Sequence, residues 1–494
     1  MTAGTAAREP ARATILALLA GFVAIWTVYF TLTEAPVPIK HDMLEAYAWG
    51  QEFQLGYHQH PPFWAWICGL WFLVFPSTGW AFSLLSSVNA AIGVGGAWLL
   101  IGDFARGSKR MAAWALLLLT PLYTVYAYKY DANIIFLSLW PWTLHFFVRS
   151  LRSRGLRDTL LLGLFAGFAL LSKYYALILL ATCFLAALQS PQRRAWFASP
   201  APYVAAAVTV LLCVPHVWWL LNNRAPPVHY LESVSGRSWH HVWTHLGKTL
   251  GDAVAMNLGP AAVIALAFRL SRQRFALVTR GSADFPMLVT LVLAPLVLTL
   301  AGALVLRTTV TSEMTLGIFP LLPLLAIEIS GLRDVDKLSR MAVGIAAVAN
   351  VGALLLSPAI MLSRTFLSPA AMKQAPLQEV AVAATRLWHA RTGLKLRYVA
   401  GTAWYENATA FYSPDHPHVF EYFDYAMNLW VTPEDLARHG LLSICAADDK
   451  SCLARTAHFV TPATTSTRLT LSHRFLGHVA RPVAYVVTII PPQR

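Results

Sequence analysis

Charged residues are scarce in this chain, and acidic residues are scarcer than basic ones. Only 13% of the 494 residues are charged while 57% are hydrophobic, and the mean hydropathy is +0.53. Too little polar surface is left to cover a water-soluble globule, which excludes a soluble cytoplasmic enzyme. The 18 Trp, 17 Tyr and 25 Phe residues exclude an intrinsically disordered chain.

Cysteines and nucleotide-binding motifs are also few. No Cys/His spacing of the structural zinc kind and no glycine-rich phosphate loop is present, so we expect no metal, no other cofactor and no nucleotide site. Cys445 and Cys452 have six residues between them. They form either a disulfide in an oxidising compartment or two free thiols, because spacing alone does not fix the geometry.

Long apolar runs, by contrast, are abundant. A run of about 20 apolar residues spans the hydrocarbon core of a bilayer. Eleven such spans are expected, near residues 12–33, 80–102, 111–128, 132–149, 157–172, 174–189, 199–220, 250–269, 285–306, 313–330 and 341–362. The first follows a weakly basic tail without a small-residue cleavage site, and predicts an uncleaved anchor with a cytoplasmic N-terminus.

The net charge of +14 is distributed as short basic clusters between apolar runs, which indicates membrane topology and no nucleic-acid partner. All five clusters lie on the cytoplasmic side if the Trp-rich stretch 61–76 is an interfacial segment and not a span. The clusters are Arg106/Lys109/Arg110, Arg149/Arg152/Arg154/Arg157, Arg193/Arg194, Arg269/Arg272/Arg274 and Arg333/Lys337/Arg340. The segments rich in acids, His and aromatic residues then collect on the outer face.

The last 130 or so residues are more polar and contain no further apolar run of spanning length. Short strand-like stretches at 396–400, 418–423, 441–446 and 482–490 alternate with helix-like ones at 373–391 and 432–438. The sequence therefore predicts an all-α polytopic membrane domain over 1–362 and a small α/β soluble domain over 363–494 on the outer face.

The densest polar segment follows the first span and contains Asp42 and Glu45. If a helix begins here, their spacing of three places both carboxylates on one face. A carboxylate at the mouth of a membrane cavity is a candidate general base. The same pair also resembles a capping box with Asp42 as the helix cap, so both interpretations stay open.

Two further charged residues fall at outer ends of expected spans. Asp131 precedes the helix expected at 132–149, where it either caps that helix or belongs to the site. Lys173 lies between two short spans, where it either extends to the interface or supplies a point charge for a phosphate. Charged groups this close to a bilayer are energetically costly and usually have a role.

The loop after residue 215 combines aromatic rings, amides and a cation. Trp219 and Asn222 suit the stacking face and hydrogen bonds of a sugar, and Arg224 suits an anionic group. An ordinary aromatic belt at the membrane interface explains a single Trp equally well.

These motifs, taken in order, resemble the GT-C glycosyltransferases that use polyprenyl-phosphate sugars. The resemblance rests on Glu45-Ala-Tyr-Ala-Trp49, Gly56-Tyr-His-Gln-His-Pro-Pro62, Asp131-Ala132 and Leu171-Ser-Lys-Tyr174. The most similar branch contains protein mannosyltransferases, the aminoarabinose transferase of lipid A and galacturonosyltransferases of the lipopolysaccharide core. Many members have Asp directly before the Glu of the first motif, where this chain has Leu44, which leaves open whether Asp42 or Glu45 is the base.

The resemblance implies an inverting transferase with its site on the periplasmic face of a bacterial inner membrane. The donor is a polyprenyl-phosphate sugar, with galacturonic acid favoured, and the acceptor is lipid A or lipopolysaccharide. A protein acceptor, or a lipid-linked sugar transporter in another class, are the alternatives. Expected catalytic residues are Asp42, Glu45 and Asp131; phosphate contacts are Lys173, Tyr174, Arg224 and Arg307; substrate contacts are Tyr57, His58, His60, Trp219 and Asn222.

Overall fold

The computed structural model describes residues 9–224, 226–278, 282–368 and 374–493. These residues form two compact units. The first comprises Met1–Trp26, Gln59–Phe63 and Ser86–Leu354, and the second comprises Thr27–His58, Trp64–Leu85 and Leu355–Arg494. Because the units interleave along the chain, the helices α1 (Arg12–Glu34), α4 (Gly79–Phe104) and α16 (Val335–Phe366) contribute to both.

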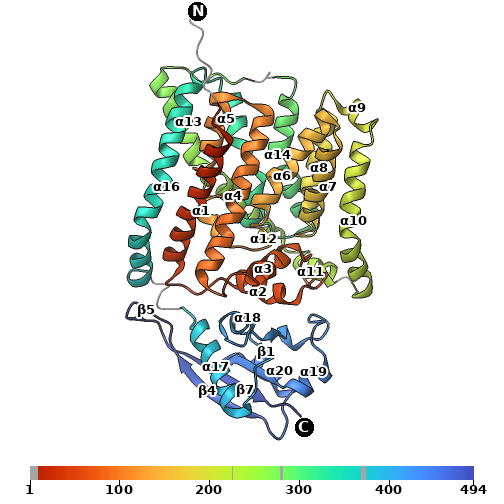
Figure 1. Ribbon diagram of the computed structural model, residues 1–494, viewed down its shortest axis with the longest axis vertical. Helices are drawn as coiled ribbons and strands as arrows, with labels where there is room; N and C mark the ends of the chain where they lie inside the picture. Colours follow the sequence, from red (N-terminus) through yellow and green to blue (C-terminus); the bar gives the residue numbers. More distant parts are fainter. Residues whose placement is uncertain (1–8, 225, 279–281, 369–373, 494) are drawn as a thin grey trace, which may run out of the picture. The chain divides into compact units, whose positions relative to one another are not determined.

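The first unit is helical, and Figure 1 shows its helices arranged as one bundle. Besides its parts of α1, α4 and α16, it contains α5 (Gly107–Leu117), η1 (Val125–Tyr128), α6 (Phe136–Ser153), α7 (Leu156–Leu170), α8 (Ala176–Gln189), α9 (Arg193–Phe197), α10 (Ala201–Asn222), α11 (Pro226–Val234), α12 (Trp239–Met256), α13 (Leu258–Ser271), α14 (Phe285–Leu306), η2 (Ser312–Ile318) and α15 (Leu322–Ser330). Each of the eleven expected spans overlaps one or two of these helices, several of them only in part.

Length and hydropathy identify the strongest spans among the described residues. Five helices are long and apolar enough to cross a membrane, namely α1, α4, α10, α14 and α16. The pair α12 and α13, bent by 44° at the break between them, makes a sixth candidate. The helices α7, α8 and α15 cover expected spans with 15, 14 and 9 residues. The chain is therefore a multi-pass membrane protein.

Proline sets two helix ends that differ from the expected spans. The run 111–128 is α-helical only to Leu117, four residues before Pro121, and ends in the short 3-10 helix η1. The run 250–269 breaks after Met256, four residues before Pro260. A proline ring clashes with the carbonyl of the residue four positions earlier, so each helix ends at that carbonyl.

Charged side chains at one set of helix ends in the first unit pair with one another. Lys109 of α5 lies 2.9 Å from Glu328 of α15. Arg152 of α6 lies 2.7 Å from Asp284, which directly precedes α14. Lys109 and Arg152 belong to clusters expected on the cytoplasmic side, and their partners join helices far apart in sequence.

The second unit combines the first polar loop with the C-terminal segment. The loop contributes α2 (His41–Glu52) and α3 (Phe63–Phe72, from Trp64 onward). With ten residues, α3 is about 15 Å long and too short to cross a bilayer, in line with the interfacial segment expected at 61–76. The C-terminal segment contributes α17 (Leu377–Thr392), β1 (Tyr398–Gly401), α18 (Ala403–Tyr412), β2 (His418–Val419), η4 (Glu421–Phe423), α19 (Pro433–His439), β3 (Leu441–Ala446), α20 (Lys450–Ala457), β4 (Thr465–Leu471), β5 (Arg474–Phe475), β6 (His478–Val479) and β7 (Val483–Ile490).

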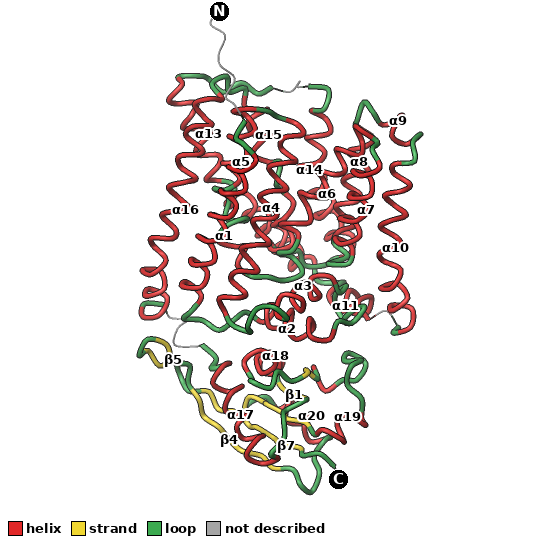
Figure 2. The backbone as a smooth tube through the Cα atoms, in the orientation of Figure 1, coloured by secondary structure: helices red, strands yellow, loops and turns green. Residues whose placement is uncertain are grey.

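A mixed five-stranded sheet forms the core of the C-terminal segment, in the order β2-β1-β3-β7-β4. The strands β2, β1 and β3 are parallel, whereas β7 runs antiparallel to both β3 and β4. Figure 2 shows these strands in yellow together with the helices of the same segment in red. Cys445 of β3 and Cys452 of α20 form a disulfide, which decides between the two alternatives left open by their spacing.

Two glycines let α2 and α3 approach each other within the second unit. A Cβ atom placed on Gly69 would lie 2.2 Å from the carbonyl oxygen of Gly50, and one on Gly50 would lie 2.7 Å from backbone atoms of α3. Backbone atoms cannot move aside as a flexible side chain does. Glycine is therefore required at this crossing.

We expect Gly69→Ala to destabilise the protein by roughly 1–3 kcal/mol, because the added methyl group forces α2 and α3 apart. Gly21→Ala in α1 is the matched control, since its Cβ would meet no atom within 4 Å. Thermal unfolding of the purified variants in detergent measures both. Equal melting temperatures for the two variants would contradict the close crossing.

Candidate functional site

The helix α2 carries the first two candidate acids. It begins at His41 with Lys40 as its cap and no side-chain capping bond, so the interpretation of Asp42 as a helix cap is wrong. Asp42 instead lies in the first turn, where the positive end of the helix dipole favours a carboxylate. Its side chain is 39% exposed, whereas Glu45 is buried. One turn of helix therefore gives the two acids different access to a substrate.

Beneath α2, two further carboxyl groups are buried within the second unit. Glu421 of η4 accepts a hydrogen bond from the indole Nε1 of Trp49, at 3.1 Å. Nδ1 of His58 lies 3.7 Å from the other oxygen of Glu421. Glu406 of α18 is fully buried. Neither Glu421 nor Glu406 is among the expected site residues, because no local pattern marks them.

Burial shifts the pKa values of Glu406 and His58. It raises the pKa of Glu406 well above its ordinary value, and the neighbouring charge of Glu421 raises that pKa further. Burial also lowers the pKa of His58, although Glu421 opposes this change. Burial therefore favours the protonated, neutral form of Glu406 and the neutral imidazole form of His58.

Two expected substrate contacts, Tyr57 and His58, lie in the interior of the second unit. The ring of Tyr57 stacks on Trp49 with 4.7 Å between ring centroids, and its hydroxyl donates to the carbonyl of Trp49. His58 contacts Trp49 edge-on. Both residues thus pack the loop against α2, and a substrate contact by either one stays a prediction.

Asp131 lies in the first unit, in the turn before α6, and is 2% exposed. Its Oδ1 accepts hydrogen bonds from the backbone N–H groups of Asn133 and Ile134, at 2.7 and 2.9 Å. Asp131 therefore closes the turn before α6 and does not cap that helix, which begins later than expected, at Phe136, with Ile135 as its cap and no side-chain capping bond. The second oxygen, Oδ2, lies 3.5 Å from the ammonium group of Lys129.

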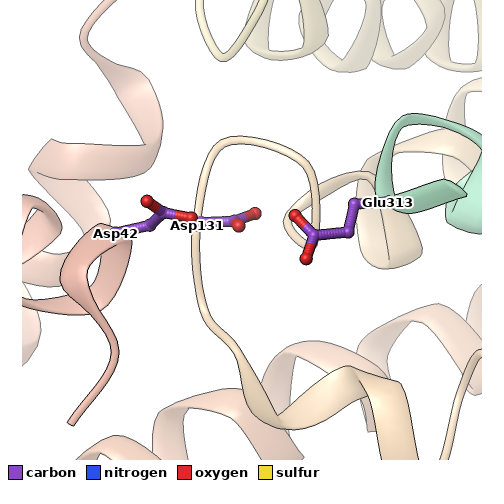
Figure 3. A group of neighbouring side chains, drawn as sticks. All are labelled: Asp42, Asp131 and Glu313. Atoms are coloured by element: carbon purple, nitrogen blue, oxygen red, sulfur yellow. The ribbon is translucent and has the colours of Figure 1, made fainter. Parts of the chain in front are cut away.

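Lys129 also contacts Glu313, which the sequence did not single out. The ammonium lies 3.0 and 3.2 Å from the two Glu313 oxygens. Figure 3 shows the carboxylates of Asp131 and Glu313, which come within 4.8 Å of each other. Asp42, also labelled there, belongs to the second unit. Two acids so close repel each other, and the shared lysine offsets that repulsion.

The turn that holds Asp131 also holds Lys173. The ammonium of Lys173 donates a hydrogen bond to Oδ1 of Asn133, two residues after Asp131. The structure therefore brings together two of the expected site segments within the first unit. Lys173 is partly buried, so it lies against the protein and does not extend freely to the interface.

Tyr174 continues this group toward α10. Its hydroxyl lies 2.8 Å from Nε2 of His216. The ring of His216 in turn stacks with Trp219 at 6.0 Å between centroids. Another expected contact, His60, lies beside Tyr230 of α11 at 6.5 Å. Trp219 is 6% exposed, so its ring is mainly a packing element of α10.

The remaining expected contacts lie at exposed helix ends. Asn222, the last residue of α10, donates from its side chain to the carbonyl of Trp218. Arg224 is exposed with a left-handed backbone conformation. Arg307, which follows α14, donates to the carbonyl of Arg237 and lies over the ring of Trp239. Phosphate contacts by the two arginines stay predictions.

Comparisons with known proteins agree with this arrangement. The family described as dolichyl-phosphate-mannose-protein mannosyltransferase matches residues 59–219, a segment that contains Asp131 and Lys173. The lipopolysaccharide core galacturonosyltransferase RgtB of Rhizobium johnstonii is 29% identical over 220 residues. That match covers 43% of this chain, and the chain spans 42% of the length of this curated relative.

Solved structures of ArnT from Cupriavidus metallidurans resemble the chain over nearly its whole length. The form bound to undecaprenyl phosphate has a TM-score of 0.61 and the apo form 0.62, each with 13% sequence identity and coverage of 97% of this chain and 98% of ArnT. The chain has the GT-C fold. The resemblance identified from the sequence motifs is thus confirmed.

The burial of Glu406 leads us to expect that the stability of the protein depends on pH. Ionised Glu406 is disfavoured in the folded state, so folding stability is lost as the pH rises above the ordinary carboxyl pKa. We expect Glu406→Gln to raise the melting temperature by a few degrees at pH 7 and to leave it nearly unchanged near pH 4. Glu434→Gln, at an exposed position of α19, is the control and should change neither value. A melting temperature that falls at pH 7 in Glu406→Gln would contradict a raised pKa for Glu406.

Proposed function

We propose that this protein is an inverting glycosyltransferase that moves one sugar from a polyprenyl-phosphate carrier to lipid A or a lipopolysaccharide glycolipid. The observation that carries the proposal is that the matched segment 59–219 contains Asp131 and Lys173, which the fold joins through one turn. RgtB, named for galacturonosyl transfer to lipopolysaccharide core, favours galacturonic acid as the sugar. ArnT, solved with undecaprenyl phosphate, favours a polyprenyl-phosphate donor.

In the proposed reaction Asp42 is the general base. It takes the proton of an acceptor hydroxyl, and the hydroxyl oxygen attacks the anomeric carbon of the donor. The bond from that carbon to the phosphate oxygen breaks, and its electron pair leaves with the polyprenyl phosphate. A direct displacement of this kind inverts the anomeric centre and needs a single base. Asp42 suits this role better than Glu45, because Asp42 is partly exposed and Glu45 is buried.

The cations of the first unit suit the departing phosphate. Lys173 is held by Asn133, so its ammonium is positioned before the phosphate gains charge. Tyr174 lies next to it in the chain, and Arg224 and Arg307 are further candidates for the same anion. One oxygen of Asp131 accepts hydrogen bonds from the backbone of its own turn, and the other lies beside the ammonium of Lys129. We assign it the role of positioning this cationic segment.

The proposed location is a bacterial inner membrane, with the catalytic face and the segment 363–494 in the periplasm and the domain 1–362 in the bilayer. The basic clusters near Lys109 and Arg152 support this orientation, since Lys and Arg collect on the cytoplasmic side. Oxidising conditions suit the Cys445–Cys452 disulfide, which supports the same side for the C-terminal segment.

Two alternative functions have specific support. A protein hydroxyl as the acceptor is favoured by the mannosyltransferase family that matches 59–219. A lipid-linked sugar transporter fits the membrane architecture, but transporters place charged sites near the middle of the bilayer between related halves. Here Lys129 and Asp131 precede α6, and Lys173 lies between α7 and α8, so these charges occupy helix ends.

We expect Asp42→Asn to lower kcat for sugar transfer by at least about a hundredfold, because the amide cannot accept the proton. Glu45→Gln, one turn later in the same helix, should retain activity within about tenfold of the parent. The assay uses purified protein in detergent, undecaprenyl-phosphate galacturonate and lipid A–core glycolipid, with the product measured by mass spectrometry.

This assay also separates the alternatives. Transfer in detergent, without a membrane gradient, would exclude transport as the activity. If Asp42→Asn transfers sugar as fast as the parent, Asp42 is not the base. If the parent transfers sugar to a peptide and leaves the glycolipid unmodified, the acceptor assignment is overturned.

A further inference from the structure

The C-terminal segment packs directly on the helix that carries Asp42, and both belong to the second unit. Phe411 of α18 contacts the ring of Tyr47 edge-on, with 5.0 Å between centroids. The hydroxyl of Tyr47 also lies 3.0 Å from Nδ1 of His416. Farther along α2, Trp49 donates to Glu421. These contacts hold α18 and the residues that follow it against the part of α2 around Tyr47 and Trp49.

The first turn of α18 reaches the first turn of α2 through Trp404. Its indole stacks on the ring of His41, with 5.4 Å between centroids and 27° between the planes. His41 in turn lies beside Asp42, with Nδ1 3.5 Å from Oδ1. Trp404 nevertheless stays 51% exposed, so His41 covers only part of the ring. An exposed aromatic surface, that of Trp404, is therefore separated from the proposed base Asp42 only by the side chain of His41.

The reach of a general base limits where an acceptor can lie. A hydroxyl that gives its proton to Asp42 must come within about 3 Å of the carboxylate. The sugar ring that bears this hydroxyl is bonded directly to it. The ring must therefore lie against the side chains that surround Asp42. His41 is such a side chain, and Trp404 of the C-terminal segment stacks on it.

We propose that Trp404 is a binding residue for the acceptor sugar, which stacks the apolar C–H face of its ring on the exposed part of the indole. This inference rests on the proposed function. Trp suits the task because it offers a large contact area and has only two side-chain torsions to immobilise. The C-terminal segment then contributes directly to acceptor recognition, and not only to the support of α2.

The test compares Trp404→Ala and Trp404→Phe with the parent in the transfer assay with lipid A–core glycolipid. We expect Trp404→Ala to raise the KM for the glycolipid roughly tenfold, because the stacking surface is lost. Trp404→Phe should recover most of that loss, since a ring is restored. Trp243→Ala in α12 is the control, because Trp243 is also an exposed tryptophan, 59% exposed, and should leave the KM unchanged.

Donor hydrolysis, in which water replaces the glycolipid, gives the second measurement. It should proceed at the parent rate in Trp404→Ala, since Trp404 contacts only the acceptor. If the parent transfers sugar and Trp404→Ala keeps the parent KM, this inference is overturned while the proposed function stands. If donor hydrolysis falls together with transfer, Trp404 acts through the fold and not through the acceptor. If the parent neither transfers nor hydrolyses, the proposed function itself fails.

Discussion

The buried contact between Glu421 and Trp49 is the constraint that joins α2, the helix of Asp42, to the C-terminal segment. A carboxylate that is 3% exposed is costly to bury, and each lost partner would leave an uncompensated polar group. Glu421 obtains one such partner from α2, because the indole of Trp49 donates a hydrogen bond to it. The first loop and the C-terminal segment belong to the same compact unit. The same body carries the partly exposed Asp42 and the stack of Trp404 on His41.

In the first unit, charged side chains at helix ends are paired with other polar groups, because single charges close to a bilayer are unfavourable. Lys129 lies between Asp131 and Glu313, and Lys173 is held by the amide of Asn133. Lys129 offsets one of the two carboxylate charges, and the second ammonium, that of Lys173, is kept in a defined place by Asn133. This is an arrangement that a phosphate ligand can use, because the cation is already oriented when the anion arrives.

The sequence predicts the elements that carry a strong local pattern. The span 285–306 and the strand 441–446 have the predicted bounds, because each is a mainly apolar run; Asp284 and Arg307 bound the first, and Gly440 directly precedes the second. The helix α18 could not be predicted, since its buried face carries Glu406, Asn407 and Thr409 and lacks an amphipathic pattern. Asp131 and Lys173 were found from their places at span ends. Glu313 and Glu421 were missed because their partners lie 184 and 372 residues away, and no local spacing encodes such contacts.

The proposed reaction adds one sugar from a polyprenyl phosphate to a lipopolysaccharide-type glycolipid. Mass spectrometry of membrane glycolipids from cells with and without the gene tests for this transfer. In cells without the gene, we expect one sugar increment, with the mass of a hexuronate for galacturonic acid, to disappear from the glycolipid while its polyprenyl-phosphate donor accumulates. Unchanged glycolipids together with an unchanged donor pool would contradict it.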